Sequence, residues 1–269
     1  MQNNKQFDNH PAGNVRWYED FFLQERRGEW VAHNIIEKKR YEFDDEGLLI
    51  KEQTIKSDST VESEVLYKYF EGRLVEEITT NNWGTSIRVN TYDNKGNLTY
   101  FKQLNPNNNF SCQFNYDEHG RPSKEIVEYS DEGKDIYEYK YREENEIIIV
   151  ETSINGKLDS TEHMNKNGAI IMRTSLIAEK REFVYSEDGL LLKEIVGDYI
   201  REFEYDSHQL PIRYHGYRKL ESGREEFNKE YYDIELDDRG NWKEIKSYVE
   251  TESFPKHLKL IRRRTIEYV

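Results

Sequence analysis

The sequence predicts an all-β fold in which tandem antiparallel β-hairpin repeats form one long, coiled or partly rolled sheet. Three observations predict it: a recurring turn motif, strand-like segments in which apolar and charged residues alternate, and many aromatic residues in a polar chain. Aromatic residues make up 13% of the 269 residues, although mean hydropathy is −1.00 and charged residues reach 34%. Disordered chains are poor in aromatic residues, so this composition indicates a folded sheet with a thin core.

A motif of the form Tyr-x-Tyr-Asp-x-x-Gly recurs at intervals of about 24 residues, a spacing typical of repeat proteins. The glycine of the motif, or the residue that replaces it, stands at Gly28, Gly47, Gly72, Gly96, Gly120, Asn145, Gly168, Gly189, Gln209 and Gly240. The series predicts about ten hairpin units, each with two strands of roughly 8 to 10 residues.

The residue types of the motif explain its geometry. Two tyrosines separated by one residue lie on the same face of a strand. Asp at the first turn position can accept a hydrogen bond from the backbone two residues later, and Gly can adopt the positive φ that closes a type I turn with a bulge. Asn145 tolerates that φ well and Gln209 less well. Asn155-Gly156 is the strongest single hairpin signal.

The segments between turns alternate in polarity, as in Glu125–Tyr129 and Leu190–Val196. Such alternation is typical of an antiparallel sheet with one buried face and one solvated face. An apolar residue such as Leu48, Leu98 or Trp242 follows the turn glycine and is expected to pack back across the hairpin.

The ends of the chain are expected to cap the repeat array. Residues 1–27 form the N-terminal cap, 28–243 the hairpin array, and 244–269 the C-terminal capping strands of one continuous domain. Around Val15 to Gln24, aromatic residues recur at near-helical spacing, so a short helix and a first strand pair remain alternatives there.

The charge balance excludes some partners. Lys and Arg number 39 against 53 Asp and Glu, which gives a formal charge of −14. Free nucleic acid is not an expected partner, because binding to phosphates needs a basic surface. The only dense basic run, Arg262-Arg263-Arg264, is expected on a solvated strand face. An acidic surface would instead suit a basic protein partner.

Cysteine content and apolar patterning bear on compartment. Cys112 is the only cysteine, and its strand-like surroundings indicate a small buried residue. The first residues lack the apolar core of a secretory signal, and no apolar run approaches the length of a membrane span. The sequence therefore predicts a cytoplasmic protein without membrane contact.

The motif resembles the YD repeats of RHS-type bacterial repeat proteins, over roughly Phe22 to Trp242. The segments that carry the resemblance best are Asp44–Gly47, Asp93–Gly96, Asp117–Gly120 and Asp237–Trp242. The resemblance implies long coiled antiparallel sheets, which in large members roll into a shell around a toxin domain. This chain departs from large members because it has few units and only about 27 residues after Trp242, with no toxin-like domain among them.

No catalytic, cofactor-binding or metal-ligating residues are predicted. The seven histidines, at positions 10, 33, 119, 163, 208, 215 and 257, lack the spacing of a zinc site, and His119 and His208 are expected in exposed turns. Phosphate-binding glycine loops and nucleophile elbows are absent from the sequence. The chain is therefore not expected to be an enzyme, and no cofactor is expected.

Two classes of function are left open. The first is a noncatalytic protein-binding repeat module, with neutralisation or chaperoning of a basic toxin as its narrower form. The second is a carbohydrate-binding or carbohydrate-active protein that presents Trp83, Trp242 and the paired tyrosines as platforms. A structural fragment of a larger surface assembly is a third option, which an unpaired edge strand would permit.

Overall fold

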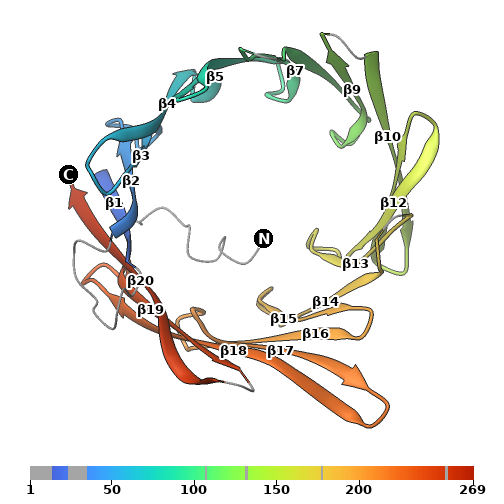
Figure 1. The fold of residues 1–269 in the computed structure, drawn as a ribbon. Helices are drawn as coiled ribbons and strands as arrows, with labels where there is room; N and C mark the ends of the chain where they lie inside the picture. The colour runs from blue at the N-terminus through green and yellow to red at the C-terminus, as the bar shows by residue number, and fades with distance from the viewer. Residues whose placement is uncertain (1–13, 24–34, 107, 131–132, 177, 252–253) are drawn as a thin grey trace. The chain divides into compact units, whose positions relative to one another are not determined.

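In the computed structural model, residues 14–23, 35–106, 108–130, 133–176, 178–251 and 254–269 are described. This part of the chain contains twenty strands and no helix, and the strands belong to one hydrogen-bonded sheet (Figure 1). Every pairing between strands of one compact unit is antiparallel, as between β2 and β3 or β11 and β12. The prediction of an all-β, antiparallel hairpin fold is therefore confirmed.

The strands follow one another with short connections. They are β1 (Val15–Leu23), β2 (Ile35–Phe43), β3 (Leu49–Ile55), β4 (Val61–Phe70), β5 (Arg73–Asn81), β6 (Gly84–Tyr92), β7 (Leu98–Leu104), β8 (Phe110–Tyr116), β9 (Pro122–Tyr129), β10 (Gly133–Glu144), β11 (Ile147–Ile154), β12 (Lys157–Met164), β13 (Ile170–Ser175), β14 (Arg181–Tyr185), β15 (Leu191–Val196), β16 (Tyr199–Tyr205), β17 (Pro211–Leu220), β18 (Gly223–Leu236), β19 (Trp242–Thr251) and β20 (Phe254–Tyr268).

The chain forms two compact units. Unit 1 comprises the described residues up to Gly84 together with Phe203–Gly216 and Glu226–Val269. Unit 2 comprises Thr85–Glu202 and Tyr217–Glu225. Both units contain hairpins of the repeat.

The two ends of the chain pair with each other in unit 1, where β1 lies between β2 and β20 (Figure 1). Tyr18 pairs with Tyr41 on one side and with Ile266 on the other. The segment from Val15 to Leu23 is therefore a strand, and the helix alternative is wrong. The expectation of an open coiled sheet also needs correction, because the β1–β20 pairing satisfies backbone groups that an open sheet leaves unpaired at its ends.

Seven turns of the motif share the predicted geometry, and the turn from Lys56 to Thr60 after β3 has the same backbone hydrogen bonds. In each, the first turn residue donates its N–H to the carbonyl of the fifth residue, and the fourth donates to the carbonyl of the first. At Asp44, the side-chain Oδ1 also accepts from Glu46 N at 3.0 Å and Leu48 N at 2.8 Å. Equivalent turns begin at Asp93, Asp117, Asn165, Ser186, Asp206 and Asp237. Gln209 occupies the glycine position with a φ of 62°.

Two other copies of the motif use a shorter turn. Glu71 and Gly72 have φ values of 51° and 72°, and Asn145 and Glu146 have 51° and 65°. Positive φ at both central residues is the mark of a two-residue type I′ hairpin, so Asn145 begins such a turn instead of replacing a glycine in a longer one. Asn155-Gly156 forms the same turn, as predicted. Gly28 and Trp30 lie outside the described residues.

The alternation of strand direction defines two edges of the sheet in each unit. Turns that follow even-numbered strands lie at one edge, which we call the Asp-turn edge because it carries the seven shared turns. Turns that follow odd-numbered strands lie at the opposite edge, which we call the variable-turn edge. The loops there include residues 56–60, 82–83, 155–156 and 197–198.

The core is small. A compact cluster forms around Trp242 and Ile245 with Tyr232, Ile234 and Leu236. Most strand residues elsewhere are half-buried on both faces, as in β3, where every residue from Leu49 to Ile55 is of intermediate burial. A sheet with one fully buried face and one solvated face is therefore not what forms, and contacts between side chains of neighbouring strands carry much of its stability.

Candidate functional site

The tyrosines of the motif hold the turns in place. Tyr69 donates its hydroxyl to the carbonyl of Leu49 at 3.0 Å, and Tyr116 donates to the carbonyl of Leu98 at 2.8 Å. Each acceptor lies two residues after the glycine of the preceding Asp-turn. The second tyrosine of one hairpin thus locks the turn of the hairpin before it, a structural role that the sequence pattern did not reveal.

The first tyrosine of the motif binds a carboxylate on the preceding strand. Tyr67 donates to Glu52 at 3.3 Å, and Tyr139 donates to Glu125 at 3.0 Å. Glu125 also accepts from Sγ of the buried Cys112 at 3.1 Å. Burial, and then the Glu125 hydrogen bond, raise the pKa of Cys112 to about 12. The thiol therefore stays protonated at neutral pH and is a weak nucleophile.

The basic run Arg262–Arg264 does not lie on a solvated face as a whole. Arg262 and Arg264 are buried, and only Arg263 is directed to solvent, where it pairs with Glu244 at 2.7 Å. Arg264 binds both carboxylate oxygens of Asp20, at 2.6 and 2.9 Å. Its guanidinium lies 3.8 Å from the Trp242 ring centroid. The alternation of strand side chains sends two of the three arginines inward, so the expectation of a solvated run is wrong.

The two tryptophans considered as sugar platforms have opposite environments. Trp242 is 7% exposed and belongs to the core, whereas Trp83 is 85% exposed in the turn between β5 and β6. The paired tyrosines are largely engaged in the hydrogen bonds described above. Of the predicted platforms, Trp83 is the one that the structure leaves accessible.

The histidines do not form a metal site in the described part of the chain. His119 and His208 are exposed turn residues, as expected, and their backbone N–H groups donate to Asp117 and Asp206. His215 is buried in β17 and contacts the Glu226 carboxylate. Among the described residues, no group of three or more His, Cys, Asp or Glu side chains could hold a metal ion. His10 and His33 lie outside those residues.

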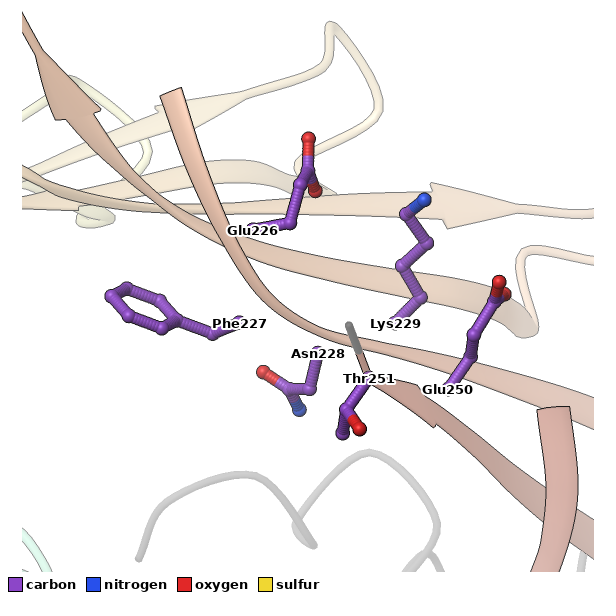
Figure 2. A pocket seen from close by; sticks show the side chains of 6 residues that line it. All are labelled: Glu226, Phe227, Asn228, Lys229, Glu250 and Thr251. Atoms are coloured by element: carbon purple, nitrogen blue, oxygen red, sulfur yellow. The ribbon is translucent and has the colours of Figure 1, made fainter. Parts of the chain in front are cut away.

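One pocket lies between β18 and β19 in unit 1 (Figure 2). It encloses about 240 Å³ and is lined by Glu226, Phe227, Asn228, Lys229, Glu250 and Thr251. In Figure 2 these side chains spread outward from the two strands and do not converge on one point. Glu250 is held by the Tyr231 hydroxyl at 2.7 Å, and Glu226 contacts His215. The carboxylates are thus engaged in the sheet.

A second pocket lies at the variable-turn edge of unit 2, where β12 begins and β13 ends. It encloses about 180 Å³, and Leu158 and Leu176 lie in its wall together with polar residues of the two strands. Leu158 is 46% exposed and Leu176 is 74% exposed.

Exposed apolar side chains gather at the variable-turn edge more than at the Asp-turn edge. In unit 2 they are Leu104, Leu158, Leu176, Tyr199 and Leu220, and in unit 1 they are Val61 and Trp83. At the Asp-turn edge, the apolar residues that follow the turn glycine, such as Leu48 and Leu190, are half-buried, and the exposed apolar residues near this edge are fewer: Phe70, Val184, Leu192 and Ile212. The variable-turn edge of unit 2 is therefore the candidate functional site. Sequence reasoning missed it, although each of these residues lies within or beside a turn that follows an odd-numbered strand.

Comparisons with known proteins give no family. No family model and no curated protein matches the chain. Among solved structures, a porin-like protein from Bacteroides uniformis is 14% identical, with 96% of this chain and 99% of that chain covered and a TM-score of 0.40. A Tc holotoxin pore from Photorhabdus luminescens is 15% identical, with 92% of this chain and 15% of that chain covered and a TM-score of 0.29. Structural similarity at these TM-scores does not indicate a function.

The expectation of a cytoplasmic location is corrected. The end strands β1 and β20 pair with each other, so the sheet is closed at the chain's ends and is not the open sheet on which the expectation was built. The expectation rested on the first residues and on apolar runs, which do not by themselves fix a compartment. The described residues include no helix that is long and apolar enough to cross a membrane.

Proposed function

We propose that this chain is a noncatalytic protein-binding module whose variable-turn edge docks a partner protein. The observation that carries the proposal is the series of exposed apolar side chains at that edge in unit 2, among them Leu158, Leu176 and Tyr199. Exposed apolar patches on polar proteins mark interaction surfaces. The repeat places one such turn after every second strand, which suits an extended partner surface.

A noncatalytic role is supported by the carboxylates, many of which accept hydrogen bonds within the fold. Carboxylates such as Glu52 and Glu125 accept hydrogen bonds from tyrosines, and Asp residues of the shared turns accept from backbone N–H groups. The two pockets, of about 240 and 180 Å³, are smaller than the roughly 300–1,000 Å³ of small-molecule sites. The carboxylates near the larger pocket diverge, whereas general acid–base catalysis needs groups that converge on a reacting atom.

The partner in this proposal is a basic protein. The formal charge of −14 favours association with a positively charged surface, which charge steering would also accelerate. The narrower form, in which the partner is a toxin that this chain neutralises or chaperones, rests on the resemblance to YD repeats. The tyrosine locks and the shared Asp-turns support a YD-type repeat, because the second Tyr, the Asp and the Gly of the motif each have a structural function in them.

The experiment that tests the proposal is affinity capture from the native cell lysate at low and at high salt, followed by reconstitution. We expect one basic protein to be captured in stoichiometric amount at low salt, to be lost at high salt, and to bind the purified chain in native mass spectrometry. Capture of no protein that reconstitutes with the purified chain would contradict the proposal.

Carbohydrate binding is the second candidate, and the 85% exposure of Trp83 is the observation that favours it. Aromatic rings exposed to solvent can stack on sugar rings. A glycan array probed with the wild-type chain and with Trp83→Ala checks this candidate. Binding that disappears in the variant would support it, and the absence of binding by the wild-type chain would remove it.

A further inference from the structure

The pocket at the start of β12 and the end of β13 lies beside the last hydrogen bonds of the β12–β13 ladder. The ladder between the two strands runs to the Ser160–Ser175 pair, and one residue further the Leu176 N–H donates to the carbonyl of Asp159 at 3.0 Å. The neighbouring ladder between β13 and β14 ends earlier, at the Arg173–Arg181 pair. The last residues of β13 thus lie beyond the β13–β14 ladder, where the pocket opens.

The size and lining of this pocket suit one protein side chain. A volume of about 180 Å³ is too small for a typical small-molecule ligand, whose sites enclose roughly 300–1,000 Å³. Leu158 and Leu176 supply apolar walls, and Ser160 and Thr174 supply polar ones. A branched aliphatic side chain can fill such a space and shield both leucines from water.

The charge around the pocket indicates what should flank that side chain. The Asp159 carboxyl belongs to a lining residue and forms no ion pair among the described residues. The chain as a whole carries a formal charge of −14. Lys or Arg beside the inserted side chain would therefore meet a complementary charge.

We propose that the pocket formed by Leu158, Asp159 and Leu176 anchors an aliphatic side chain of the basic partner protein, with a flanking Lys or Arg directed to Asp159. This inference rests on the proposed protein-binding function and names its anchoring site. The apolar contact supplies most of the affinity, and the Asp159 carboxylate selects a basic segment.

Two synthetic peptides test the site. One is a fluorescein-labelled nonapeptide of alternating Lys and Leu, and the other has the same charge with Ser in place of Leu. Fluorescence anisotropy gives the Kd of each for the wild-type chain, for Leu176→Asp and for Leu192→Asp. Leu192 is a matched control, because it is a 38% exposed leucine of β15 in the same unit and its substitution changes the net charge equally.

We expect the Lys–Leu peptide to bind the wild-type chain and Leu192→Asp with similar Kd values. Leu176→Asp should bind at least about tenfold more weakly, as expected when a buried leucine-sized contact is lost. The Lys–Ser peptide should be weaker for the wild-type chain by a similar factor. Hydrogen exchange at the Leu176 amide should slow when the Lys–Leu peptide binds. Circular dichroism of both variants checks that each is folded.

Three results would overturn the inference. Equal Kd values for Leu176→Asp and Leu192→Asp would place the contact elsewhere, and capture of the basic partner by both variants would leave the proposed function intact. Equal binding of the two peptides would exclude an aliphatic anchor. A wild-type chain that dimerises and becomes monomeric in Leu176→Asp alone would identify a second copy as the occupant. Failure of the wild-type chain to bind any basic protein would instead contradict the proposed function itself.

Discussion

At the Asp-turn edge, seven turns repeat one pattern of hydrogen bonds, and the tyrosines of the following hairpins lock several of them. At the variable-turn edge, the loops differ in length and apolar side chains such as Leu158 and Leu176 extend into solvent. The first edge repeats one set of internal contacts, whereas the contacts at the second, such as those of Asp58 and Asn155, differ from loop to loop. The repeat motif therefore specifies the fold at one edge and leaves the turns of the other free to vary.

The largest expected effect concerns neither edge but the β1–β20 pairing in unit 1. Asp20→Asn removes the charge that Arg264 binds with two hydrogen bonds, and it leaves two buried arginines without that carboxylate. Loss of one partner from a buried ion pair costs about 3–5 kcal/mol. We expect a loss of that size in the free energy of unfolding measured with urea. Arg263→Gln, at the exposed position between the two buried arginines, is the control and should change stability by less than about 1 kcal/mol.

A smaller effect is expected from the glycines of the Asp-turn edge. Gly120 has a φ of 76°, and Gln209 occupies the equivalent position with a φ of 62°. Gly120→Ala should destabilise the chain by about 1–2 kcal/mol, because side chains are disfavoured at positive φ. Nothing lies within 4 Å of a Cβ added at Gly120, so a steric clash would not explain the loss. Gln209→Gly should have the opposite sign, and a destabilising result for it would contradict the shared geometry of the turns.

The Asp237 carboxyl at the Asp-turn edge should make the stability of the fold depend on pH. Burial alone would raise the pKa of Asp237, but hydrogen bonds from the Tyr268 hydroxyl and from the backbone of Asn241 and Arg239 outweigh it and hold the pKa below its ordinary value of 3.8. A depressed pKa in the folded state contributes stability that is present above the unfolded pKa and lost as pH falls through the folded pKa. We therefore expect this contribution to disappear below about pH 4. In urea titrations, Asp237→Asn should flatten the acid limb, and an unchanged limb would contradict the assignment.

The turns could be predicted from sequence because their chemistry is local. The side chain of Asp44 contacts backbone groups only two and four residues away, so the motif itself contains the needed information. Asn145 was misassigned because two-residue and four-residue turns can share a glycine-like residue, and the register that separates them depends on strand pairing. Whether a two-residue or a four-residue turn forms therefore depends on which strand residues pair, and the turn residues alone do not determine it.

The buried arginines and the candidate site depend on distant parts of the chain. Arg264 binds the carboxylate of Asp20, which is 244 residues away in sequence, and the residues around Arg264 do not predict this partner. The pocket between Leu158 and Leu176 likewise forms only where one ladder continues and the next one stops. Aliphatic residues in strands are usually read as buried, so their exposure can be recognised only when the pairing is known.

The smallest expected effect is the one that compares the two edges directly. Leu176→Ser at the variable-turn edge should change the free energy of unfolding by less than about 0.5 kcal/mol, because an exposed side chain contributes little to stability. Leu48→Ser at the Asp-turn edge should cost more, about 1–2 kcal/mol, because Leu48 is half-buried after its turn. Urea unfolding of the two variants in parallel measures the difference. Equal losses would mean that Leu176 stabilises the fold. Partner binding would then not be needed to explain why a leucine stands at this exposed position.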